Sequence, residues 1–317
     1  MALLNPRLNR AGWRVDRAPT HANWKSAVVH FDTGSMHQDG IMMNENYTPK
    51  ISVVTCTYNS QAFLAGALAS IEGQTYRHIE HINNDSHSTD ATLDILGDYI
   101  QRNQGNYPIK LLQSEPKGVG NALNVATQGA TGDVIHYLHS DDYYLDPAVL
   151  ERVAGHFNEN PQLVWLTGNF VVEFKGRRII LPQTHILQPN LEIALSIMNF
   201  ISHENTFMRR EAVLAYGGFN ETKTEVVEYS LWLRLLKDHR PLIVNDEFTV
   251  FIIHKGSTST GNVFKLLKSI RRAFHTQRKE QVLPLVGYYP KRRAYLAVKT
   301  IIKKVADMRG SLTMRML

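Results

Sequence analysis

The sequence predicts an α/β fold with a mostly parallel, doubly wound sheet flanked by helices. Between residues 51 and 172, β-branched segments of strand length alternate with segments of helical periodicity. This alternation is typical of βαβ units, in which helices cover both faces of a parallel sheet. A chain of 317 residues, 43% of them hydrophobic, is long enough to bury such a sheet in one large domain or two smaller ones.

The predicted elements begin at Ile51 and contain no internal repeat. The first strand, 51–57, is rich in β-branched residues, and an amphipathic helix follows it. Next come a strand at 78–84, a helix at 90–102, a strand at 109–113, a short helix opening at Gly118, a strand at 133–139, a helix at 147–158 and a strand at 163–172. Beyond Arg178 we expect a helix near 191–200, a strand at 205–208, a helix at 228–237 and a strand at 242–254.

Three segments of different character are expected along the chain. Residues 1–49 lack periodicity and form either a loosely structured extension or a stretch upstream of a later start, such as Met36, Met42 or Met43. Residues 50–261 form the α/β domain, and residues 262–317 form a basic tail. The single cysteine, Cys56, excludes an intramolecular disulfide and fits a reducing compartment. Without a signal sequence or an apolar run of ~20 residues, we expect a cytoplasmic protein.

Polar clusters follow three of the predicted parallel strands. They are Thr57-Tyr58-Asn59, Asp85 to Asp90, and Ser140-Asp141-Asp142. The carboxyl ends of parallel strands meet at one sheet edge, where open α/β sheets bind ligands. Helix capping by Ser88 or Asp90 would explain one cluster, but a shared ligand crevice explains all three.

Asp141 and Asp142 are the strongest candidates for a metal site. Two adjacent carboxylates repel each other unless a cation or hydrogen-bond donors compensate them, and hard divalent cations prefer oxygen ligands. The alternative is a solvated turn after a strand. The sequence therefore predicts Mn²⁺ or Mg²⁺ at this strand end.

Eight segments, in order, resemble family 2 glycosyltransferases with the GT-A fold. The resemblance runs from Ile51-Ser-Val-Val-Thr-Cys-Thr-Tyr-Asn59 to Glu228-Tyr-Ser-Leu-Trp-Leu-Arg-Leu235. Between them lie 74–80 with 85–96, 114–118, 130–135, 138–142, 203–207 and 217–221. The resemblance implies an inverting enzyme that uses a nucleotide-sugar donor and keeps the mostly parallel GT-A sheet.

The resemblance also implies roles for individual residues. Asp141 and Asp142 would hold a cation bridging the donor's phosphates, with His254 at the end of a later strand reaching the metal or diphosphate. Asp85 would accept a hydrogen bond from a uracil or thymine imide. The other residues assigned to nucleotide binding are Thr57, Tyr58, Asn59, Lys117, Asn124 and Asp141.

Glu228 is the candidate general base. Leu231, Trp232 and Leu235 share its helix face, whereas a glutamate kept for solubility would lie on the opposite face. At a helix start it could instead complement the helix dipole. Glu225 is the fallback base. His203, Glu225 and Trp232 are expected to line the pocket between donor and acceptor.

Four features depart from the family pattern. His139 stands where an acidic or amide residue is common, although imidazole also binds Mn²⁺. Asn83 and Asn84 replace apolar residues of the second strand, so they face the crevice or shorten that strand. Glu228 replaces the more frequent Asp, and no Asp precedes Lys117. Such changes indicate a distinct donor or a decayed enzyme.

The basic tail, residues 262–317, carries 14 Lys and Arg but only two acidic residues, so its formal charge is +12. Because the whole chain has a formal charge of +6, residues 1–261 carry −6. The tail segments 265–279 and 291–309 read as two basic amphipathic helices. Such helices favour anionic membrane surfaces, although packing against the catalytic domain is an alternative. Nucleic acid is not an expected partner, because the aromatic residues are not interleaved as stacking platforms.

Together these observations favour a metal-dependent, inverting glycosyltransferase. It would move a sugar from a UDP- or dTDP-sugar to a growing glycan, with the acceptor expected to be lipid-linked at the inner membrane face. One rival is a nucleotidyltransferase, but residues 57–64 lack the glycine-rich, basic phosphate loop it would need. The other is a non-catalytic scaffold that docks on membranes.

Overall fold

The computed structural model describes residues 16–17, 48–184, 191, 194–195, 199–221 and 227–254. Their strands are β1 (Asp16–Arg17), β2 (Ile51–Thr57), β3 (Ile79–Asp85), β4 (Ile109–Gln113), β5 (Val134–Tyr137), β6 (Tyr143–Tyr144), β7 (Trp165–Phe174), β8 (Arg177–Leu181), β9 (Thr206–Arg209) and β10 (Leu242–Ile252). Their helices are α1 (Leu64–Glu72), α2 (Thr92–Arg102), α3 (Val119–Gly129), α4 (Val149–Glu159), α7 (Arg210–Ala215) and α8 (Tyr229–Leu235), with a 3-10 turn at His203–Asn205. Most predicted elements are confirmed to within a few residues.

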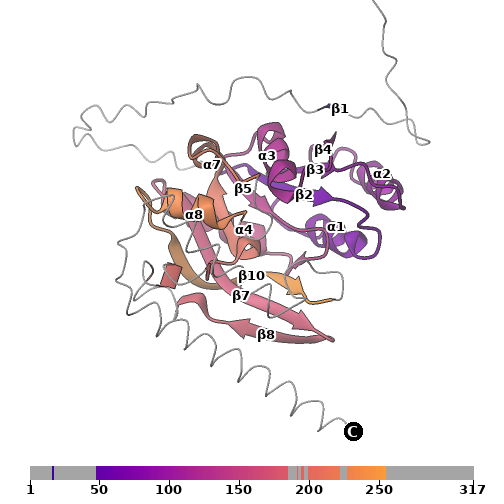
Figure 1. Ribbon diagram of the computed structural model, residues 1–317. Helices are drawn as coiled ribbons and strands as arrows, with labels where there is room; N and C mark the ends of the chain where they lie inside the picture. The colour runs from indigo at the N-terminus through magenta and orange to yellow at the C-terminus, as the bar shows by residue number, and fades with distance from the viewer. Residues whose placement is uncertain are drawn as a thin grey trace, which may run out of the picture.

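The strands form one ten-stranded sheet in the order β1-β4-β3-β2-β5-β9-β7-β10-β6, with β8 beside β7 (Figure 1). The first half is parallel throughout, as predicted. The second half is mixed: β9 is antiparallel to both of its neighbours, and β10 is parallel to β7 but antiparallel to β6. The loop at 199–205 leads into β9 at the carboxyl end of β5, so β9 runs in the direction opposite to β5 and β7.

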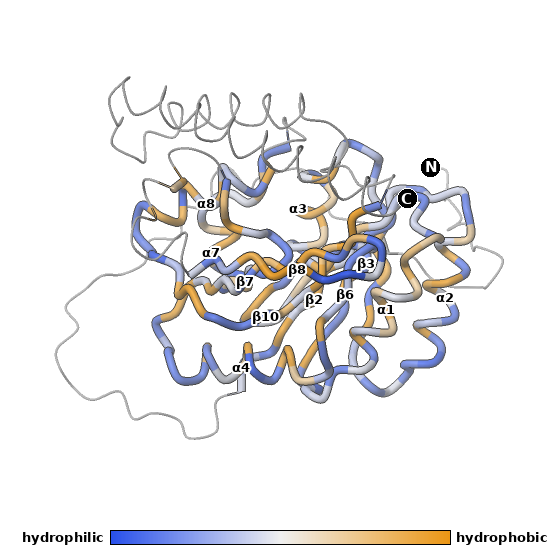
Figure 2. Tube along the Cα trace, turned by 90° about the horizontal axis from the view of Figure 1, so that it is seen from below, coloured by the Kyte–Doolittle hydropathy of each residue, from blue (hydrophilic) through white to orange (hydrophobic). Residues whose placement is uncertain are grey.

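Helices cover both faces of the sheet, which confirms a doubly wound α/β architecture. Ile51 and Val53 pack with residues of α1, α2 and α4, whereas Val54 packs with residues of α3, α7 and α8. This alternation follows from the two-residue period of a strand. Figure 2 shows α3, α7 and α8 on one side of the sheet and α1, α2 and α4 on the other.

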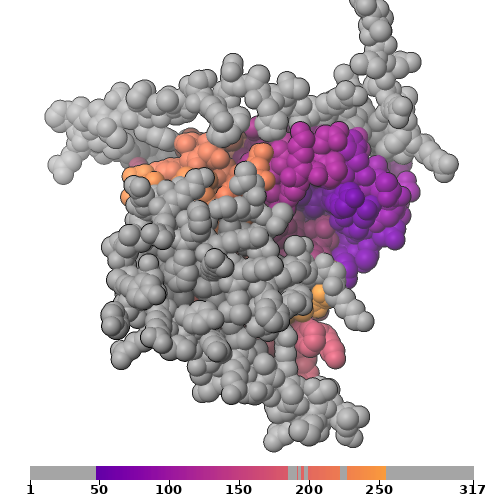
Figure 3. All heavy atoms as spheres, in the orientation of Figure 1, coloured from indigo at the N-terminus to yellow at the C-terminus, as the bar shows by residue number. Residues whose placement is uncertain are grey.

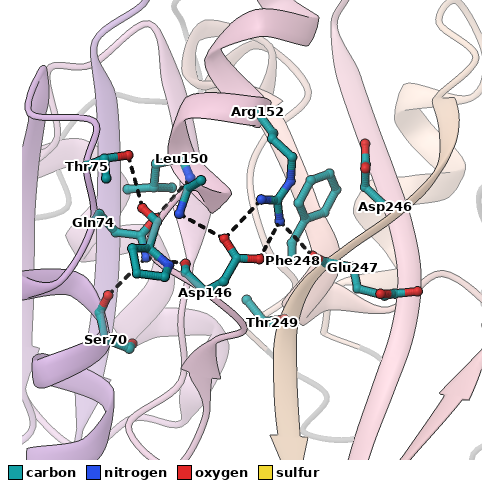
Figure 4. Close-up of polar contacts among 12 residues, drawn as sticks. Ser70, Gln74, Thr75, Asp146, Leu150, Arg152, Asp246, Glu247, Phe248 and Thr249 are labelled. Atoms are coloured by element: carbon teal, nitrogen blue, oxygen red, sulfur yellow. Dashed lines mark hydrogen bonds and ion pairs between the residues drawn. The ribbon is translucent and has the colours of Figure 1, made fainter.

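The start of α4 is anchored to both α1 and β10 (Figure 4). Arg152 donates two hydrogen bonds, of 3.0 and 2.9 Å, to the carboxylate of Asp146, and a third of 3.2 Å to the carbonyl of Glu247. Gln74 of the α1–β3 loop accepts from the amide of Leu150 at 3.0 Å. Because the loop 138–148 ends here, this network fixes the segment that carries Asp141 and Asp142.

Some predictions need correction or fall outside the described residues. The strand containing Asn83 and Asn84 is not shortened: β3 runs through both, and Asn84 Nδ2 donates to Ser114 and to the carbonyl of Ala122. Strands β6 and β8 were not predicted. The basic tail lies outside the described residues, as does the N-terminal extension apart from 48–49 and from 16–17, which pair with β4. In the ranges described, no helix is long and apolar enough to cross a membrane.

Candidate active site

Asp85 ties together the ends of β2 and β3. The strand register places Thr57 opposite Asp85, and Thr57 Oγ1 donates to Asp85 Oδ1 at 2.9 Å. Ser88 donates from its backbone amide to Oδ2 at 2.8 Å and from its hydroxyl to Oδ1 at 2.5 Å. The Asp85 carboxylate is fully buried and already accepts three hydrogen bonds. Its predicted contact with a nucleobase stays a prediction, and its visible role is to hold these two loops.

The loop after β2 is fastened to the loop after β3 through Asn59. This residue has a φ of 51°, the left-handed region that asparagine tolerates. Its amide donates to Ser88 Oγ, and its side-chain oxygen accepts from the amide of Thr89, both at 2.9 Å. Tyr58 is 61% exposed, so its ring faces outward between two braced residues. Of the predicted capping residues, Asp90 accepts from the amide of Thr92 at the start of α2.

Asp141 and His254, which are far apart in sequence, meet at the end of β10. The His254 Nε2 and Asp141 Oδ2 atoms lie 2.9 Å apart, and both side chains are partly exposed. The Phe63 ring packs on the His254 ring at a centroid distance of 4.1 Å. The structure therefore brings together two of the three predicted metal ligands.

Asp142 lies behind this pair and is buried. Its Oδ1 accepts from the amide of Ile252 at 3.0 Å, while its Oδ2 is buried without a hydrogen-bond partner. Burial raises the pKa of Asp142 well above its ordinary range, and the negative charges of Glu204 and Asp141 raise it further. Within the described ranges, no three His, Cys, Asp or Glu side chains form a group that could hold a metal ion. The metal-ligand roles of Asp141, Asp142 and His254 stay predictions, and the structure brings Asp141 and His254 into contact.

Glu228 immediately precedes α8 and is partly buried. Asn199 Nδ2 donates to its Oε1 at 2.8 Å, and the carboxylate makes no capping hydrogen bond to the helix. Burial raises the pKa of Glu228 and the charge of Glu204 raises it further, against the opposing effects of His139 and Asn199. A carboxylate with a raised pKa is better suited to accept a proton near neutral pH than an ordinary surface glutamate.

His203 lies in an aromatic cluster beneath the site. Its ring contacts those of Tyr137, His139 and Phe219, with centroids 5.2–5.4 Å apart. Burial lowers its pKa well below the ordinary value, so it is neutral, and its Nε2 is buried without a hydrogen-bond partner. Trp232 is fully buried, stacks on Trp165 and lies with its ring centroid 6.0 Å from that of His203, so its place in the pocket wall stays a prediction.

Glu204 is a site residue that the sequence analysis missed. Its negative charge raises the pKa of both Asp142 and Glu228. Its backbone carbonyl accepts from His136 Nε2 at 2.9 Å and from Thr249 Oγ1 at 2.6 Å, and Ser202 Oγ donates to its Oε2 at 2.9 Å. The available signal was an acidic residue inside the family-like segment 203–207.

Two predicted nucleotide-binding residues lie at α3. Lys117 is exposed just before the helix. The side chain of Asn124 hydrogen-bonds to the loop after α7. Its amide nitrogen donates to the carbonyl of Phe219 at 3.0 Å and to Glu221 Oε1 at 2.9 Å. Its oxygen accepts from the amide of Phe219 at 2.8 Å. Asn124 therefore fastens α3 to the loop 218–221. Glu225, the fallback base, lies outside the described residues.

Residues 52–217 match the family model described as Glycosyl transferase family 2. The match covers more than half of the chain and includes the three strand-end clusters. The chain is a family 2 glycosyl transferase.

Characterised relatives of this family 2 glycosyl transferase include enzymes of glycan synthesis. The Escherichia coli UDP-Glc:alpha-D-GlcNAc-diphosphoundecaprenol beta-1,3-glucosyltransferase WfaP is 25% identical over 260 residues, which cover 80% of this chain and 94% of WfaP. The Campylobacter jejuni GalNAc(5)-diNAcBac-PP-undecaprenol beta-1,3-glucosyltransferase is 26% identical, with 67% of each chain covered. Chondroitin synthase of Escherichia coli is 27% identical, but this chain spans only 26% of its length.

Solved structures confirm the predicted fold. A mannosyltransferase from Pyrobaculum calidifontis, PcManGT in complex with GDP-Man and Mn²⁺, superposes with a TM-score of 0.59 at 18% identity, covering 79% of this chain and 70% of its own. S. aureus TarS in complex with UDP superposes with a TM-score of 0.56 at 19% identity, covering 77% and 68%. At these identities the likeness establishes the mixed α/β architecture alone.

Proposed function

We propose that this glycosyl transferase moves a sugar from a UDP- or dTDP-sugar to a hydroxyl of a lipid-linked glycan, with inversion, in cell-surface polysaccharide biosynthesis. The observation that carries the proposal is one sheet edge with an Asp141–His254 pair, a buried carboxylate behind it and Glu228 with a raised pKa nearby. The undecaprenol-linked substrates in the names of WfaP and the Campylobacter jejuni enzyme support the acceptor class. The UDP complex of TarS supports the donor class.

We assign Asp141 and His254 as the protein ligands of a Mn²⁺ or Mg²⁺ ion. A carboxylate oxygen and an imidazole nitrogen 2.9 Å apart suit such a cation, and the donor's diphosphate carries the further oxygens that it requires. When bound, the cation would stabilise the charge that develops on the diphosphate leaving group. Asp142 would orient the Asp141–His254 pair, because its Oδ1 accepts a hydrogen bond from the amide of Ile252, two residues before His254.

Glu228 is assigned as the general base of a single displacement. The acceptor oxygen forms a bond to the anomeric carbon while the bond from that carbon to the diphosphate breaks, and the acceptor proton passes to Glu228. Attack opposite the leaving group inverts the anomeric configuration. Asn199 holds the carboxylate in place. Tyr58, whose ring is exposed beside the braced Thr57 and Asn59, is assigned to the face of the nucleobase.

The tail at 262–317, with its net charge of +12, is proposed to keep the enzyme on an anionic membrane surface. This contact would place the enzyme at the inner face of the cytoplasmic membrane, where a lipid-linked acceptor is anchored. The tail lies outside the described residues, so the proposal rests on its sequence.

The decisive experiment measures nucleoside diphosphate release from a panel of nucleotide sugars, with and without Mn²⁺, in the presence of lipid-linked acceptors. We expect metal-dependent UDP or dTDP release that requires both acceptor and Glu228. Pyrophosphate release would instead indicate a nucleotidyltransferase. If no nucleotide sugar shifts the melting temperature, with or without metal, the protein is a non-catalytic scaffold.

A further inference from the structure

The β7–β8 hairpin presents an apolar surface that the proposed function leaves unexplained. Its turn, Lys175-Gly176, has positive φ at both positions, the pattern of a tight two-residue hairpin. Beside the turn, Phe174, Ile179, Ile180 and Leu181 are 43–56% exposed, although large apolar side chains are normally sequestered. Together they account for half of the large exposed hydrophobic residues in the described ranges. Three of them, Phe174, Ile179 and Leu181, share one face of the hairpin, and exposed apolar side chains gathered in this way mark an interaction surface.

The strand register groups these side chains by face. Phe174 is paired with Arg177, and Val172 with Ile179, while Leu181 lies two residues beyond Ile179 on the same face. One face of the hairpin therefore carries Phe174, Ile179 and Leu181 together with Arg177. Figure 2 shows β8 in front of the sheet, with a hydrophobic stretch giving way to a hydrophilic one toward the turn.

The opposite face of the hairpin is braced to the candidate metal loop. Glu173 Oε2 accepts from the hydroxyl of Tyr143 at 2.7 Å, and Arg178 donates to the same hydroxyl at 3.0 Å. Tyr143 directly follows Asp142. The Glu173 carbonyl also accepts from the amide of Ile253 at 2.8 Å, next to His254. The apolar surface is thus held rigidly beside the sheet edge that carries the site, and Figure 3 shows hairpin atoms (pink) at the surface near the end of β10 (orange).

The charges of the hairpin select among possible occupants. Lys175 and Arg177 are exposed at the turn, whereas Arg178 is paired with Glu173 at 3.3 Å. A second copy docked about a two-fold axis at this edge would bring two sets of these cations together, and basic residues on an edge strand oppose such pairing. Anionic lipid headgroups complement the cations, while the acyl region accepts the apolar side chains between them.

We propose that the β7–β8 hairpin docks on an anionic lipid bilayer, with Phe174, Ile179 and Leu181 inserted below the headgroups and Lys175 and Arg177 contacting phosphates. Docking through this element holds the Asp141–His254 edge of the sheet against the membrane surface. The benefit of this position, close to a lipid-linked acceptor, rests on the proposed function. The docking of the hairpin on the bilayer does not.

The test measures the local environment of the hairpin in the full chain. In a Cys56→Ser background, which removes the single native cysteine, Ile179→Cys carries an environment-sensitive fluorophore. On phosphatidylglycerol-containing vesicles we expect a blue shift and quenching by brominated acyl chains. Labelled Leu214→Cys, 41% exposed on α7 and distant from the hairpin in Figure 1, is the matched control and should remain unquenched. Because the readout is local, binding through the tail cannot imitate it.

Two further variants separate the contributions. Lys175→Gln with Arg177→Gln should weaken binding to anionic vesicles by roughly fivefold per residue, whereas Lys237→Gln, exposed after α8, should not. All variants should keep the melting temperature of the wild type, since the altered side chains are exposed. An unquenched label at position 179, or concentration-dependent dimerisation lost in Ile179→Ser, would overturn the proposal. Vesicle binding without sugar transfer would instead refute the proposed function and leave the docking intact.

Discussion

The carboxylates of the site differ in role because their surroundings differ. Asp85 is buried but saturated by donors from Thr57 and Ser88. Asp142 is equally buried, yet one of its oxygens has no hydrogen-bond partner. Asp141 is partly exposed and faces an imidazole. Desolvation without compensation destabilises an anion. Burial therefore disfavours the charged form of Asp142, whereas Asp85 is compensated by its donors and Asp141 stays partly exposed beside His254.

Replacing Asp142 separates activity from stability. Asp142→Asn removes a buried charge that Asp141 and Glu204 repel, so its melting temperature should equal or exceed that of the wild type. Metal-dependent donor turnover should nevertheless be lost, because the variant changes both the hydrogen bond from the amide of Ile252 and the negative charge of residue 142 near His254. Calorimetry together with the acceptor-dependent nucleotide-release assay checks this outcome. A marked loss of stability with retained turnover would remove Asp142 from the site.

Glu228 offers the sharpest test of the chemistry. A positioned general base contributes about 10²–10⁴-fold to turnover, so Glu228→Gln should lower kcat on that scale while donor affinity stays within a few-fold. Glu204→Gln is the comparison, because Glu204 raises the pKa of Glu228 without taking the proton itself. It should shift the acidic limb of the pH profile to lower pH and largely spare kcat. If Glu204→Gln instead abolishes turnover and Glu228→Gln does not, the two roles are exchanged.

At the scale of elements, the site depends on how α3 meets the loop after α7. Asn124 makes three hydrogen bonds to residues 219–221. The contact is close: a Cβ atom at Gly120 would collide with the carbonyl of Asn220. Phe219 of this loop also packs against His203. These contacts of Asn124 and Gly120 therefore hold the loop whose Phe219 packs beside His203.

Removing the hydrogen bonds between Asn124 and residues 219–221 should lower the stability of the protein. Asn124→Ala leaves the amide and the carbonyl of Phe219 without these partners, for a loss of about 1–3 kcal/mol in the free energy of unfolding, measured by urea denaturation. Gln128→Ala, exposed on the same helix, is the control and should be nearly neutral. If Asn124→Ala keeps full stability but loses affinity for nucleoside diphosphates, the original nucleotide-binding assignment is restored.

At the scale of the whole molecule, buried neutral histidines couple the fold to pH. His81 bonds to Tyr99 and Thr55 within the sheet, and His136 bonds to Tyr144 and the carbonyl of Glu204. Burial lowers the pKa of each from 6.5 to about 3. Below pH 6.5 these two histidines bind protons in the unfolded chain but remain neutral in the folded chain. Their contribution to the free energy of unfolding is therefore complete above pH 6.5 and is lost as the pH falls toward 3.

The expected slope is about 1.4 kcal/mol per pH unit for each buried histidine. Melting temperatures recorded from pH 7 to pH 4 should therefore fall steadily, and His81→Gln should flatten the curve. Gln128→Ala, which alters an exposed side chain without a titratable group, is the control and should leave the slope unchanged. An unaltered slope in His81→Gln would mean that this imidazole is solvated in the folded protein.

The sequence by itself determined most strands and helices in their order along the chain, though not β1, β6, β8 or α7. It also predicted the gathering of Thr57, Asp85 and Asp141 at one edge, because periodicity and strand-end chemistry are local properties. It carried the family resemblance as well, which residues 52–217 confirm. The mixed second half of the sheet, with its antiparallel β9, depends by contrast on which strands pair, and a local pattern does not specify the partner.

Only the tertiary structure decided which side chains meet. Asp141 and His254 are 113 residues apart, and their contact requires β10 to lie between β7 and β6. Trp232 stacks on Trp165 and lies with its ring centroid 6.0 Å from that of His203. The carbonyl of Glu204, just before β9, accepts hydrogen bonds from His136 of β5 and Thr249 of β10, which are 68 and 45 residues away in the sequence. These outcomes follow from pairings between distant segments, whose free energy depends on the packed whole rather than on any one stretch of the chain.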